Sequence, residues 1–302
     1  MWEPVTLPFK NDSLSLLTLP TLPTPDEIRA CPNILWERFG FVSKVVAIND
    51  EIVVKFGTSL NASEGQALIY LERHVPTVPA PRLYAMYRDS NQLFLVMQRA
   101  PGVPLNSIWP SLTKSEKDGV VAKLRRAFDA LRQAECPWPD FYGSLDSSGV
   151  HHYLFWCQEG SRKHLGPFYG EAAFVEGLIS NYRTLIERRG CPDFKTRAYE
   201  TYLTSVLKGH RPTLTHGDVH MKNIVVAENA SRRDDQGMRS FDVVLVDWEA
   251  AGWYPDFWEI FCAASSHLFL SWEDEWCWRI HEFLEVWAAE MATMYLINKD
   301  WI

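Results

Sequence analysis

Residues 215–226, Thr-His-Gly-Asp-Val-His-Met-Lys-Asn-Ile-Val-Val, decide how the rest of the chain is interpreted. An aspartate, Asp218, stands five positions before an asparagine, Asn223, and an apolar strand-like segment follows. A second apolar segment, residues 243–246, ends on Asp247. Phosphoryl transfer from a nucleotide requires a carboxylate that orients a hydroxyl, and a carboxylate with an amide oxygen that hold Mg²⁺. The spacing therefore predicts a site for this chemistry.

The motif is specific enough to suggest a family. His, Gly, Asp and Asn at this spacing occur by chance in about one chain in 500 of this length. Together with Asp-Trp-Glu-Ala-Ala-Gly-Trp-Tyr-Pro at residues 247–255, the motif resembles the aminoglycoside phosphotransferase and choline kinase family, whose members are relatives of the protein kinases. The resemblance runs from about residue 34 to the end. It implies an α+β, bilobal protein-kinase-like fold with a small antiparallel-sheet N-lobe and a mainly helical C-lobe.

The resemblance also implies roles for the motif residues. Asp218 orients the attacking hydroxyl, and acceptance of its proton is a second role. Asn223 and Asp247 hold Mg²⁺, which neutralises charge on the phosphates. His216 braces the loop through hydrogen bonds.

Four further residues near the motif are candidates. His220 stands where protein kinases usually carry Lys, and whether His220 or Lys222 contacts the transferred phosphate stays open. A surface role for Lys222 is an equal alternative. Glu249 is a candidate to orient metal or substrate, and an acidic residue at the position of Glu259 buttresses the catalytic loop in the family.

Two β-rich segments, residues 41–48 and 51–56, flank Asn-Asp and predict a hairpin that carries Lys55. In the kinase-like fold a strand lysine reaches the α- and β-phosphates and pairs with a glutamate on the next helix. Residues 61–71 have apolar side chains at helical spacing. Glu64 is the expected partner of Lys55, with Glu72 as the alternative. The competing interpretation is that each of these residues is an ordinary surface charge.

Residues 82–87 and 92–97 predict a second hairpin. By resemblance, the segment after it is the hinge, where backbone groups from Gln98 to Ala100 hydrogen-bond the nucleotide base. Protein kinases cover the phosphates with a Gly-x-Gly-x-x-Gly loop, whereas this chain has only Gly40 at that place. This difference favours the small-molecule kinases over the protein kinases.

We expect three parts: an extended N-terminal arm (1–33), a nucleotide-binding N-lobe (34–102) and a catalytic and acceptor-binding C-lobe (103–302). The prolines of the arm argue against regular helix or sheet beyond one helical turn at residues 26–29. Apolar periodicity predicts C-lobe helices at residues 112–134, 171–189 and 195–208, and a helix opening at 255–259. The polar residues 228–240 predict a solvated hairpin loop.

Aromatic and acidic residues crowd the C-terminal third. Most of its tryptophans are expected in the core, with an aromatic acceptor pocket as the alternative. The acidic residues 273–275 are expected at a helix start, where the helix dipole favours carboxylates, rather than as an attraction for a cationic acceptor.

Bulk properties exclude several classes of protein. The net charge of −8 argues against nucleic-acid binding, which needs clustered Lys and Arg. The six cysteines show no metal or redox spacing, which favours free thiols in a reducing cytosol. No signal peptide and no apolar run of membrane-spanning length is found. We therefore expect a cytoplasmic protein with no nucleic-acid or membrane partner.

The predicted function is a Mg²⁺- and nucleoside-triphosphate-dependent phosphotransferase acting on a hydroxyl of a small molecule, with ATP or GTP as co-substrate. A protein kinase is disfavoured, because the chain has no Asp-Phe-Gly, no Ala-Pro-Glu and no room for an activation loop after Asp247. Two further functions stay open: a pseudokinase that binds nucleotide without turnover, and an enzyme that carries out a different nucleotide-dependent reaction on a metabolite.

Overall fold

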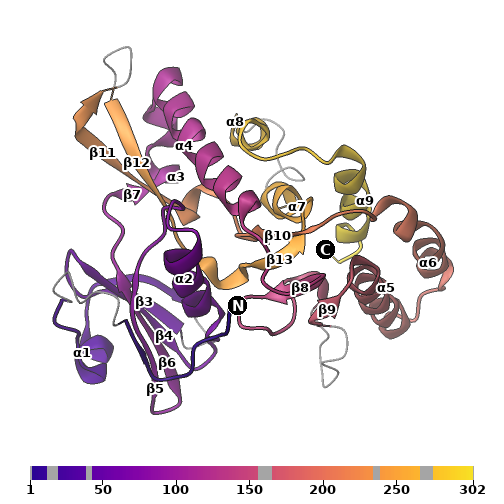
Figure 1. Cartoon of the computed structure of the whole chain (residues 1–302), viewed down its shortest axis with the longest axis horizontal. Coiled ribbons are helices and arrows are strands. Elements are labelled where there is room, and N and C mark those ends of the chain that lie inside the picture. Colours follow the sequence, from indigo (N-terminus) through magenta and orange to yellow (C-terminus); the bar gives the residue numbers. More distant parts are fainter. Residues whose placement is uncertain are drawn as a thin grey trace. The chain divides into compact units, whose positions relative to one another are not determined.

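The computed structural model describes residues 2–11, 20–38, 43–155, 165–233, 239–265 and 275–301. Contacts divide the chain into two compact units. We call residues 2–120 and 221–249 the sheet unit, and residues 121–220 and 250–302 the helical unit. Their helices and strands are labelled in Figure 1.

The sheet unit is built on a six-stranded antiparallel sheet in the order β1-β5-β6-β4-β3-β2 and a three-stranded one in the order β12-β11-β7. Its elements are β1 (Phe9–Lys10), α1 (Pro25–Ala30), β2 (Ile34–Arg38), β3 (Ser43–Ala47), β4 (Ile52–Gly57), α2 (Ser63–His74), β5 (Leu83–Asp89), β6 (Gln92–Gln98), β7 (Val103–Pro104), α3 (Leu105–Ile108), η1 (Trp109–Ser111), η4 (Met221–Asn223), β11 (Ile224–Arg233) and β12 (Arg239–Leu245).

Both predicted hairpins of this unit are confirmed in the described residues. Between β3 and β4, the side-chain oxygen of Asn49 accepts hydrogen bonds from the N–H groups of Glu51 and Ile52, both at 2.8 Å. Between β5 and β6, Ser90 and Asn91 both have positive φ angles (47° and 64°), as the tight turn of a two-residue hairpin requires. The first residues of the first hairpin, 41 and 42, and the single glycine Gly40 lie outside the described residues.

The grouping of residues differs from the predicted division at residue 102. Residues 103–120 and 221–249 belong to the sheet unit, because β11 pairs with β7 and the Leu245 N–H donates to the Pro79 carbonyl at 2.8 Å. The arm residues described also belong to this unit. Whether the functional lobes follow residue 102 stays a prediction.

The arm contains more regular structure than its prolines predict. Thr24 and Glu27 form a capping box, in which the Thr24 hydroxyl accepts from the Glu27 N–H and the Glu27 carboxylate accepts from the Thr24 N–H at 2.7 Å. Pro25 stands at the first turn, where its missing N–H leaves no bond unmade. The helix α1 therefore forms, and its Ile28 is fully buried in the core of the sheet unit.

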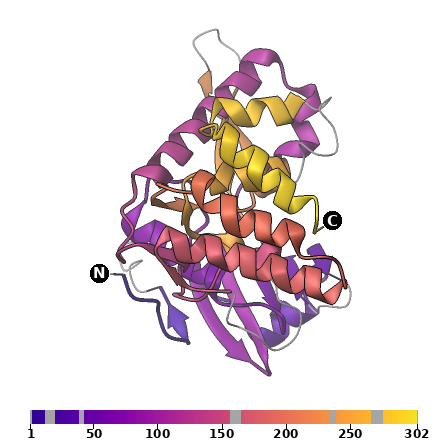
Figure 2. The ribbon, with the colours of Figure 1, turned by 90° about the vertical axis from the view of Figure 1, so that its right-hand side faces the viewer.

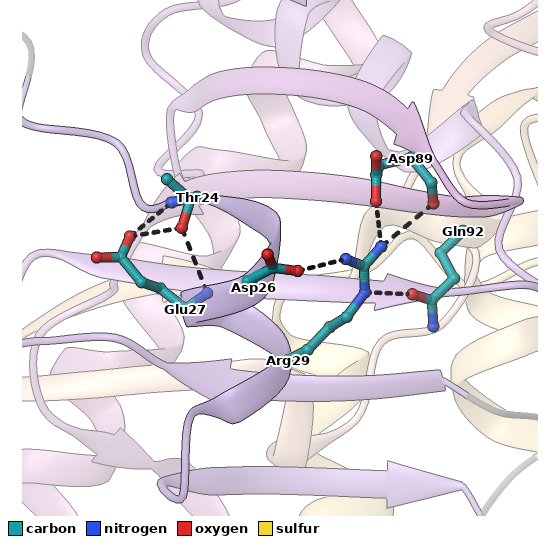
Figure 3. A network of polar contacts seen from close by, with 6 residues as sticks. All are labelled: Thr24, Asp26, Glu27, Arg29, Asp89 and Gln92. Atoms are coloured by element: carbon teal, nitrogen blue, oxygen red, sulfur yellow. Dashed lines mark hydrogen bonds and ion pairs between the residues drawn. The ribbon is translucent and has the colours of Figure 1, made fainter.

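Arg29 fastens α1 to the β5–β6 hairpin (Figure 3). Its guanidinium donates to the carboxylate of Asp89 and to the side chains of Gln92 and Asp26, at 3.0 and 3.1 Å for the last two. It also lies 5.2 Å from the ring centre of Phe94. This anchor contacts the β5–β6 turn, and none of the partners named here lies on α2.

The helical unit contains a four-stranded antiparallel sheet in the order β10-β13-β8-β9. Its elements are β8 (Phe141–Ser144), η2 (Tyr153–Phe155), β9 (Phe168–Tyr169), α5 (Glu171–Arg188), α6 (Phe194–Val206), β10 (Pro212–Thr215), β13 (Gly252–Pro255), α7 (Trp258–Ser265), α8 (Glu275–Arg279), η6 (Ile280–Glu282) and α9 (Ala288–Asn298). Helix α4 (Lys114–Gln133) and the short η5 (Trp248–Ala250) cross from one unit to the other in sequence.

The predicted helices of the C-terminal part are confirmed within two residues at their ends as α4, α5 and α6, and α7 begins at Trp258. Helices α5 and α6 lie side by side (Figure 2), joined by an ion pair between Arg183 and Glu200 at 2.6 Å. Among the described residues, no helix combines the length and apolar character that crossing a membrane requires.

Most described tryptophans of the C-terminal third are core residues, as predicted. Trp253, Trp258 and Trp276 are at most 1% exposed, and Trp258 packs in a cluster of aromatic residues in the helical unit. Trp278 is an exception, because 67% of it is exposed. Of the acidic group 273–275, only Glu275 is described, and it pairs with Arg279 one turn along α8.

The prediction of a solvated loop at residues 228–240 is wrong for its ends. Strand β11 continues to Arg233 and β12 begins at Arg239, with Glu228 opposite Phe241. Polar cross-strand contacts, such as the 2.7 Å bond from Asn229 to Asp242, stabilise a ribbon whose residues show no apolar alternation.

We predict that Gly102→Ala lowers the free energy of unfolding by roughly 1–3 kcal/mol. Gly102 has a φ of +103°, and a Cβ placed there would lie 2.0 Å from the Val226 carbonyl oxygen. The matched control is Gly119→Ala within α4, where a Cβ meets nothing within 4 Å and should stabilise the helix by about 0.5–1 kcal/mol. Equal effects in urea unfolding would contradict the packing described for Gly102.

Candidate active site

The sheet unit buries one ammonium group among three carboxylates. Lys55 Nζ lies 2.8 Å from Glu64, 2.6 Å from Asp247 and 2.8 Å from Glu249. Lys55 and Glu64 have side chains only 8% and 5% exposed, whereas Asp247 and Glu249 are 36% and 52% exposed. A buried lysine on β4 thus joins the glutamate of α2 to two carboxylates that face solvent.

The charges of this cluster act strongly on one another. Burial alone would lower the pKa of Lys55, but the three carboxylates raise it well above its usual range. Burial raises the pKa of Glu64 to about 7, and the neighbouring Lys55 opposes this rise only in part. The cluster sets three carboxyl groups against one ammonium group, so it favours an additional cation.

Backbone geometry places Asp247 and Asn223 at the same end of the β11–β12 pair. Ile224 is paired with Leu245, and the Val246 N–H donates to the Asn223 carbonyl at 2.9 Å. Asp247 has a φ of +65°, a left-handed conformation that is uncommon for a residue other than glycine and clusters at functional sites.

A second contact ties the segment after Asp247 to α2. The Ser63 hydroxyl donates to the Glu249 carbonyl oxygen at 3.1 Å. Because Ser63 directly precedes Glu64, this bond fixes the start of α2 beside the strand end that carries Asp247. Sequence reasoning missed Ser63, which has no signal other than its place at a helix start.

The donor set fits a hard divalent cation. Ligand oxygens of Glu64, Asp247 and Glu249 lie within 4.8 Å of one another. Mg²⁺ prefers carboxylate and carbonyl oxygens and usually keeps several of its waters, so one or two protein carboxylates suffice. The partly exposed Asp247 and the exposed Glu249 are the carboxylates best placed to receive it, and the buried Asn223 is held by the backbone next to Asp247.

In the helical unit, a buried glutamate holds the loop that carries Asp218. The Glu259 carboxylate accepts hydrogen bonds from the N–H groups of His216 at 2.6 Å and Gly217 at 3.2 Å. Gly217 has a φ of +82°, and a Cβ there would lie 2.6 Å from the Ala250 carbonyl oxygen. The loop conformation therefore requires glycine at this position.

Two histidines contact Asp218. The Asp218 N–H donates to His216 Nδ1 at 3.2 Å, and His220 Nε2 lies 3.5 Å from the Asp218 carboxylate. His216 is fully buried, while the Asp218 side chain is 44% exposed. The first contact is of the kind that a loop-bracing imidazole makes, and the Asp218 carboxylate is partly exposed.

A third histidine, His152, was not predicted. Its ring lies 5.1 Å from that of Trp258 and 5.6 Å from that of Phe261, both on α7. Burial lowers the pKa of His152 to about 3, and the negative charge of Asp218 opposes this shift only in part. A neutral imidazole therefore stands in the surroundings of Asp218. No sequence motif marks it.

Other predicted residues have structural contacts of their own. Glu72, the alternative partner of Lys55, instead contacts Asn11 at 2.9 Å and Arg82 at 3.4 Å. The Gln98 N–H donates to the Arg82 carbonyl at 2.8 Å.

Part of the predicted hinge is hydrogen-bonded within the sheet unit. Like the Gln98 N–H, the Arg99 N–H has a backbone partner, the Glu51 carbonyl at 2.8 Å. Base recognition by residues 98–100 stays a prediction, and it depends on Ala100 and on carbonyl oxygens. Lys222 is exposed, and the choice between Lys222 and His220 as the phosphate contact stays open.

Glu259 leads to a prediction about pH. Burial raises the pKa of Glu259 from 4.5 to about 7, although the two N–H donors lower it. Between these pH values the folded protein binds more protons than the unfolded chain, so the free energy of unfolding falls as pH rises. Relative to Glu259→Gln, the free energy of unfolding of the wild type should fall by up to about 1.4 kcal/mol for each unit that pH rises in this window.

Urea unfolding at several pH values from about 4.5 to about 7 measures this effect. The control is Glu285→Gln, which changes an exposed glutamate of the same unit and should keep the wild-type slope. If the free energy of unfolding changes with pH in the same way for the wild type and Glu259→Gln, the titration assigned to Glu259 is contradicted.

Comparison with known proteins places this geometry in a family. The model of the phosphotransferase enzyme family APH matches residues 58–294. No curated protein sequence matches the chain. The crystal structure of ADP-bound aminoglycoside phosphotransferase APH(2'')-Ib matches with a TM-score of 0.52 and 17% identity, over 87% of this chain and 80% of that chain.

A weaker structural match is aminoglycoside phosphotransferase APH(4)-Ia, with a TM-score of 0.48 and 16% identity over 78% of this chain and 72% of that chain. The family model covers most of the chain, and the APH(2'')-Ib match shows the expected α+β, protein-kinase-like fold. The chain therefore belongs to the phosphotransferase enzyme family, and with that family it is assigned as a small-molecule kinase.

Proposed function

We propose that the protein transfers the γ-phosphoryl group of a nucleoside triphosphate, with Mg²⁺, to a hydroxyl group of a small molecule. The observation that carries this proposal is the buried Lys55 held by Glu64 together with Asp247, which follows a strand at its exposed end. The order of these residues along the chain, and of the Asp218 loop between them, supports the same reaction.

In the sheet unit, Lys55 binds the nucleotide phosphates while Glu64 keeps the ammonium in place. Binding of phosphate draws Lys55 away from Asp247 and Glu249, since phosphate oxygens compete for its three N–H donors. Asp247 and Glu249, with Asn223, would hold the metal when it is bound. Bound Mg²⁺ supplies positive charge that neutralises the phosphates.

In the helical unit, Asp218 accepts a hydrogen bond from the acceptor hydroxyl and orients it for attack. The hydroxyl oxygen forms the new bond to phosphorus, the bond to the nucleoside diphosphate breaks, and Asp218 takes the hydroxyl proton. Because the transition state is loose, the protein contributes mainly orientation and charge. Glu259 and His216 contribute by fixing the backbone on either side of Asp218.

The proposal gives the acceptor as a hydroxylated small molecule and leaves ATP and GTP as alternative donors. The family assignment supports a small-molecule acceptor. Structures of the relatives include a ternary complex of APH(4)-Ia with ADP and hygromycin B and a GDP and kanamycin complex of an APH(2'') enzyme. They illustrate both nucleotide types without naming the acceptor of this chain.

The first prediction concerns Asp218. We expect Asp218→Ala to reduce phosphoryl transfer at least about a hundredfold while the unfolding midpoint stays close to that of the wild type. The carboxylate is 44% exposed, so its removal leaves little buried surface unsatisfied. Asp193→Ala, at an exposed residue of the same unit, is the control and should keep full activity. An Asp218→Ala variant with near-wild-type phosphoryl transfer would contradict the role given to Asp218.

The second prediction concerns nucleotide binding. Thermal unfolding is measured with ATP or GTP, with and without Mg²⁺. A ligand at about 100 times its dissociation constant stabilises the folded state by roughly 2.7 kcal/mol. We expect a Mg²⁺-dependent rise in the midpoint with at least one nucleotide. The rise should vanish in Asp247→Ala and persist in Asp242→Ala, at an exposed residue of β12. The absence of any rise in the wild type would argue for a protein that binds neither nucleotide.

A further inference from the structure

The first residues of the chain lie along α2, the helix that carries Glu64. Trp2 is 3% exposed, and its ring centre lies 5.2 Å from that of Tyr70 and 5.9 Å from that of His74, both edge to face. Val5 makes two hydrogen bonds with the side chain of Gln66: its N–H donates to the amide oxygen at 2.9 Å, and its carbonyl accepts from the amide nitrogen at 2.8 Å.

These contacts use one stripe of the helix. Gln66, Tyr70 and His74 are spaced by four residues, so their side chains lie above one another on one face. Glu64 precedes Gln66 by two residues and projects about 160° away around the helix, given about 100° per residue. The chain start therefore packs on the side of α2 that is turned away from the Glu64–Lys55 ion pair.

The same segment is also bonded to the sheet that carries Lys55. In β1, Phe9 pairs with Met86 and Lys10 with Ala85 on β5. The Asn11 N–H donates to the Tyr84 carbonyl at 3.0 Å, and the Asn11 side chain donates to the Leu83 carbonyl at 3.0 Å.

Asn11 also reaches the helix, because its side-chain amide donates to Glu72 at 2.9 Å. One end of the segment thus binds α2 alone, and the other joins α2 to the sheet.

A third face of α2, which carries Gly65 about 100° from both Glu64 and Gln66, packs closely on the sheet. A Cβ added at Gly65 would lie 2.5 Å from the sulfur of Met86 and 3.2 Å from a methyl carbon of Leu95. Leu95 is the residue paired with Lys55 across β6 and β4. The helix therefore packs on the sheet near the strand position of Lys55, while Trp2 and Val5 contact its Gln66 stripe.

We propose that residues 2–11 form a strap that positions α2, and through it Glu64 against Lys55, with Trp2 and Gln66 as its anchoring residues. This inference rests on the proposed function, because it gives the strap a part in nucleotide binding. Trp2 and Gln66 are positioning residues, since neither contacts Lys55, Asp247 or Glu249 in the contacts described above.

The strap has a matched control in the same part of the chain. Arg29 anchors α1 to Asp89 and Gln92 at the β5–β6 turn and makes no described contact with α2 (Figure 3). Arg29→Ala thus loosens an N-terminal attachment to the sheet unit without touching the strap. Any effect that depends on α2 should be absent from it.

The first readout is hydrogen exchange without nucleotide in Trp2→Ala, Gln66→Met, Trp2→Phe and Arg29→Ala. Gln66→Met removes both bonds to Val5 while nearly keeping the side-chain volume, so it serves if Trp2→Ala does not fold. We expect faster exchange of the α2 amides in Trp2→Ala and Gln66→Met, with near-wild-type exchange in Trp2→Phe and Arg29→Ala. Unchanged exchange at α2 in both strap variants overturns the inference.

The second readout is the affinity for ATP and GTP with Mg²⁺, measured by calorimetry. The apparent dissociation constant rises as the fraction of molecules with α2 correctly positioned falls. We therefore expect on the order of tenfold weaker binding in Gln66→Met and no change in Arg29→Ala. When Gln66→Met is combined with Glu64→Gln, it should not weaken nucleotide binding beyond the effect of Glu64→Gln alone, because the strap acts through Glu64.

An equal additional loss of affinity in the Glu64→Gln background overturns the inference while leaving the proposed function intact. If the wild type binds neither nucleotide, the proposed function fails, and exchange at α2 still decides whether the strap holds the helix.

Discussion

The structure of the sheet unit depends on one interaction, the burial of the Lys55 ammonium among the carboxylates of Glu64, Asp247 and Glu249. An ammonium that is removed from water this far is tolerated only with close charged partners. Three segments must therefore meet: β4, the start of α2 shortly after it, and the residues after β12, where Asp247 stands 192 positions beyond Lys55. The packing around them serves to hold these segments at hydrogen-bond distance.

Each segment has its own support. The central position of β4, between β3 and β6, fixes Lys55. The Ser63 bond to the Glu249 carbonyl joins the start of α2 to the third segment, and the Val246 bond to Asn223 joins the ends of β12 and β11. In the helical unit, Glu259 has a comparable role, because one buried carboxylate sets the backbone of the loop that carries Asp218.

Local patterns were sufficient to predict the elements that carry the site. The hairpin with Lys55 and the helix with Glu64 have apolar periodicity, and an apolar run ends at Asp247. The resemblance to the kinase-like fold then predicted that Lys55 pairs with Glu64, but the contacts of Lys55 with Asp247 and Glu249 were not predicted. Long-range polar contacts were not predictable in this way. Gln66 and Val5 are 61 residues apart, and nothing in either residue type signals their pairing. The extension of β11 and β12 into a polar ribbon was missed because cross-strand pairing, rather than hydrophobic alternation, stabilises it.

The central claim is that this chain moves a phosphoryl group from a nucleotide to a small-molecule hydroxyl. The most direct measurement is the mass of the products after incubation of the protein with Mg²⁺, ATP or GTP, and a set of hydroxylated compounds. We predict a product heavier than its acceptor by one phosphoryl group, with an equal amount of nucleoside diphosphate released. A product that carries the nucleotide itself, or no product from a protein that binds Mg²⁺-nucleotide, would contradict the account.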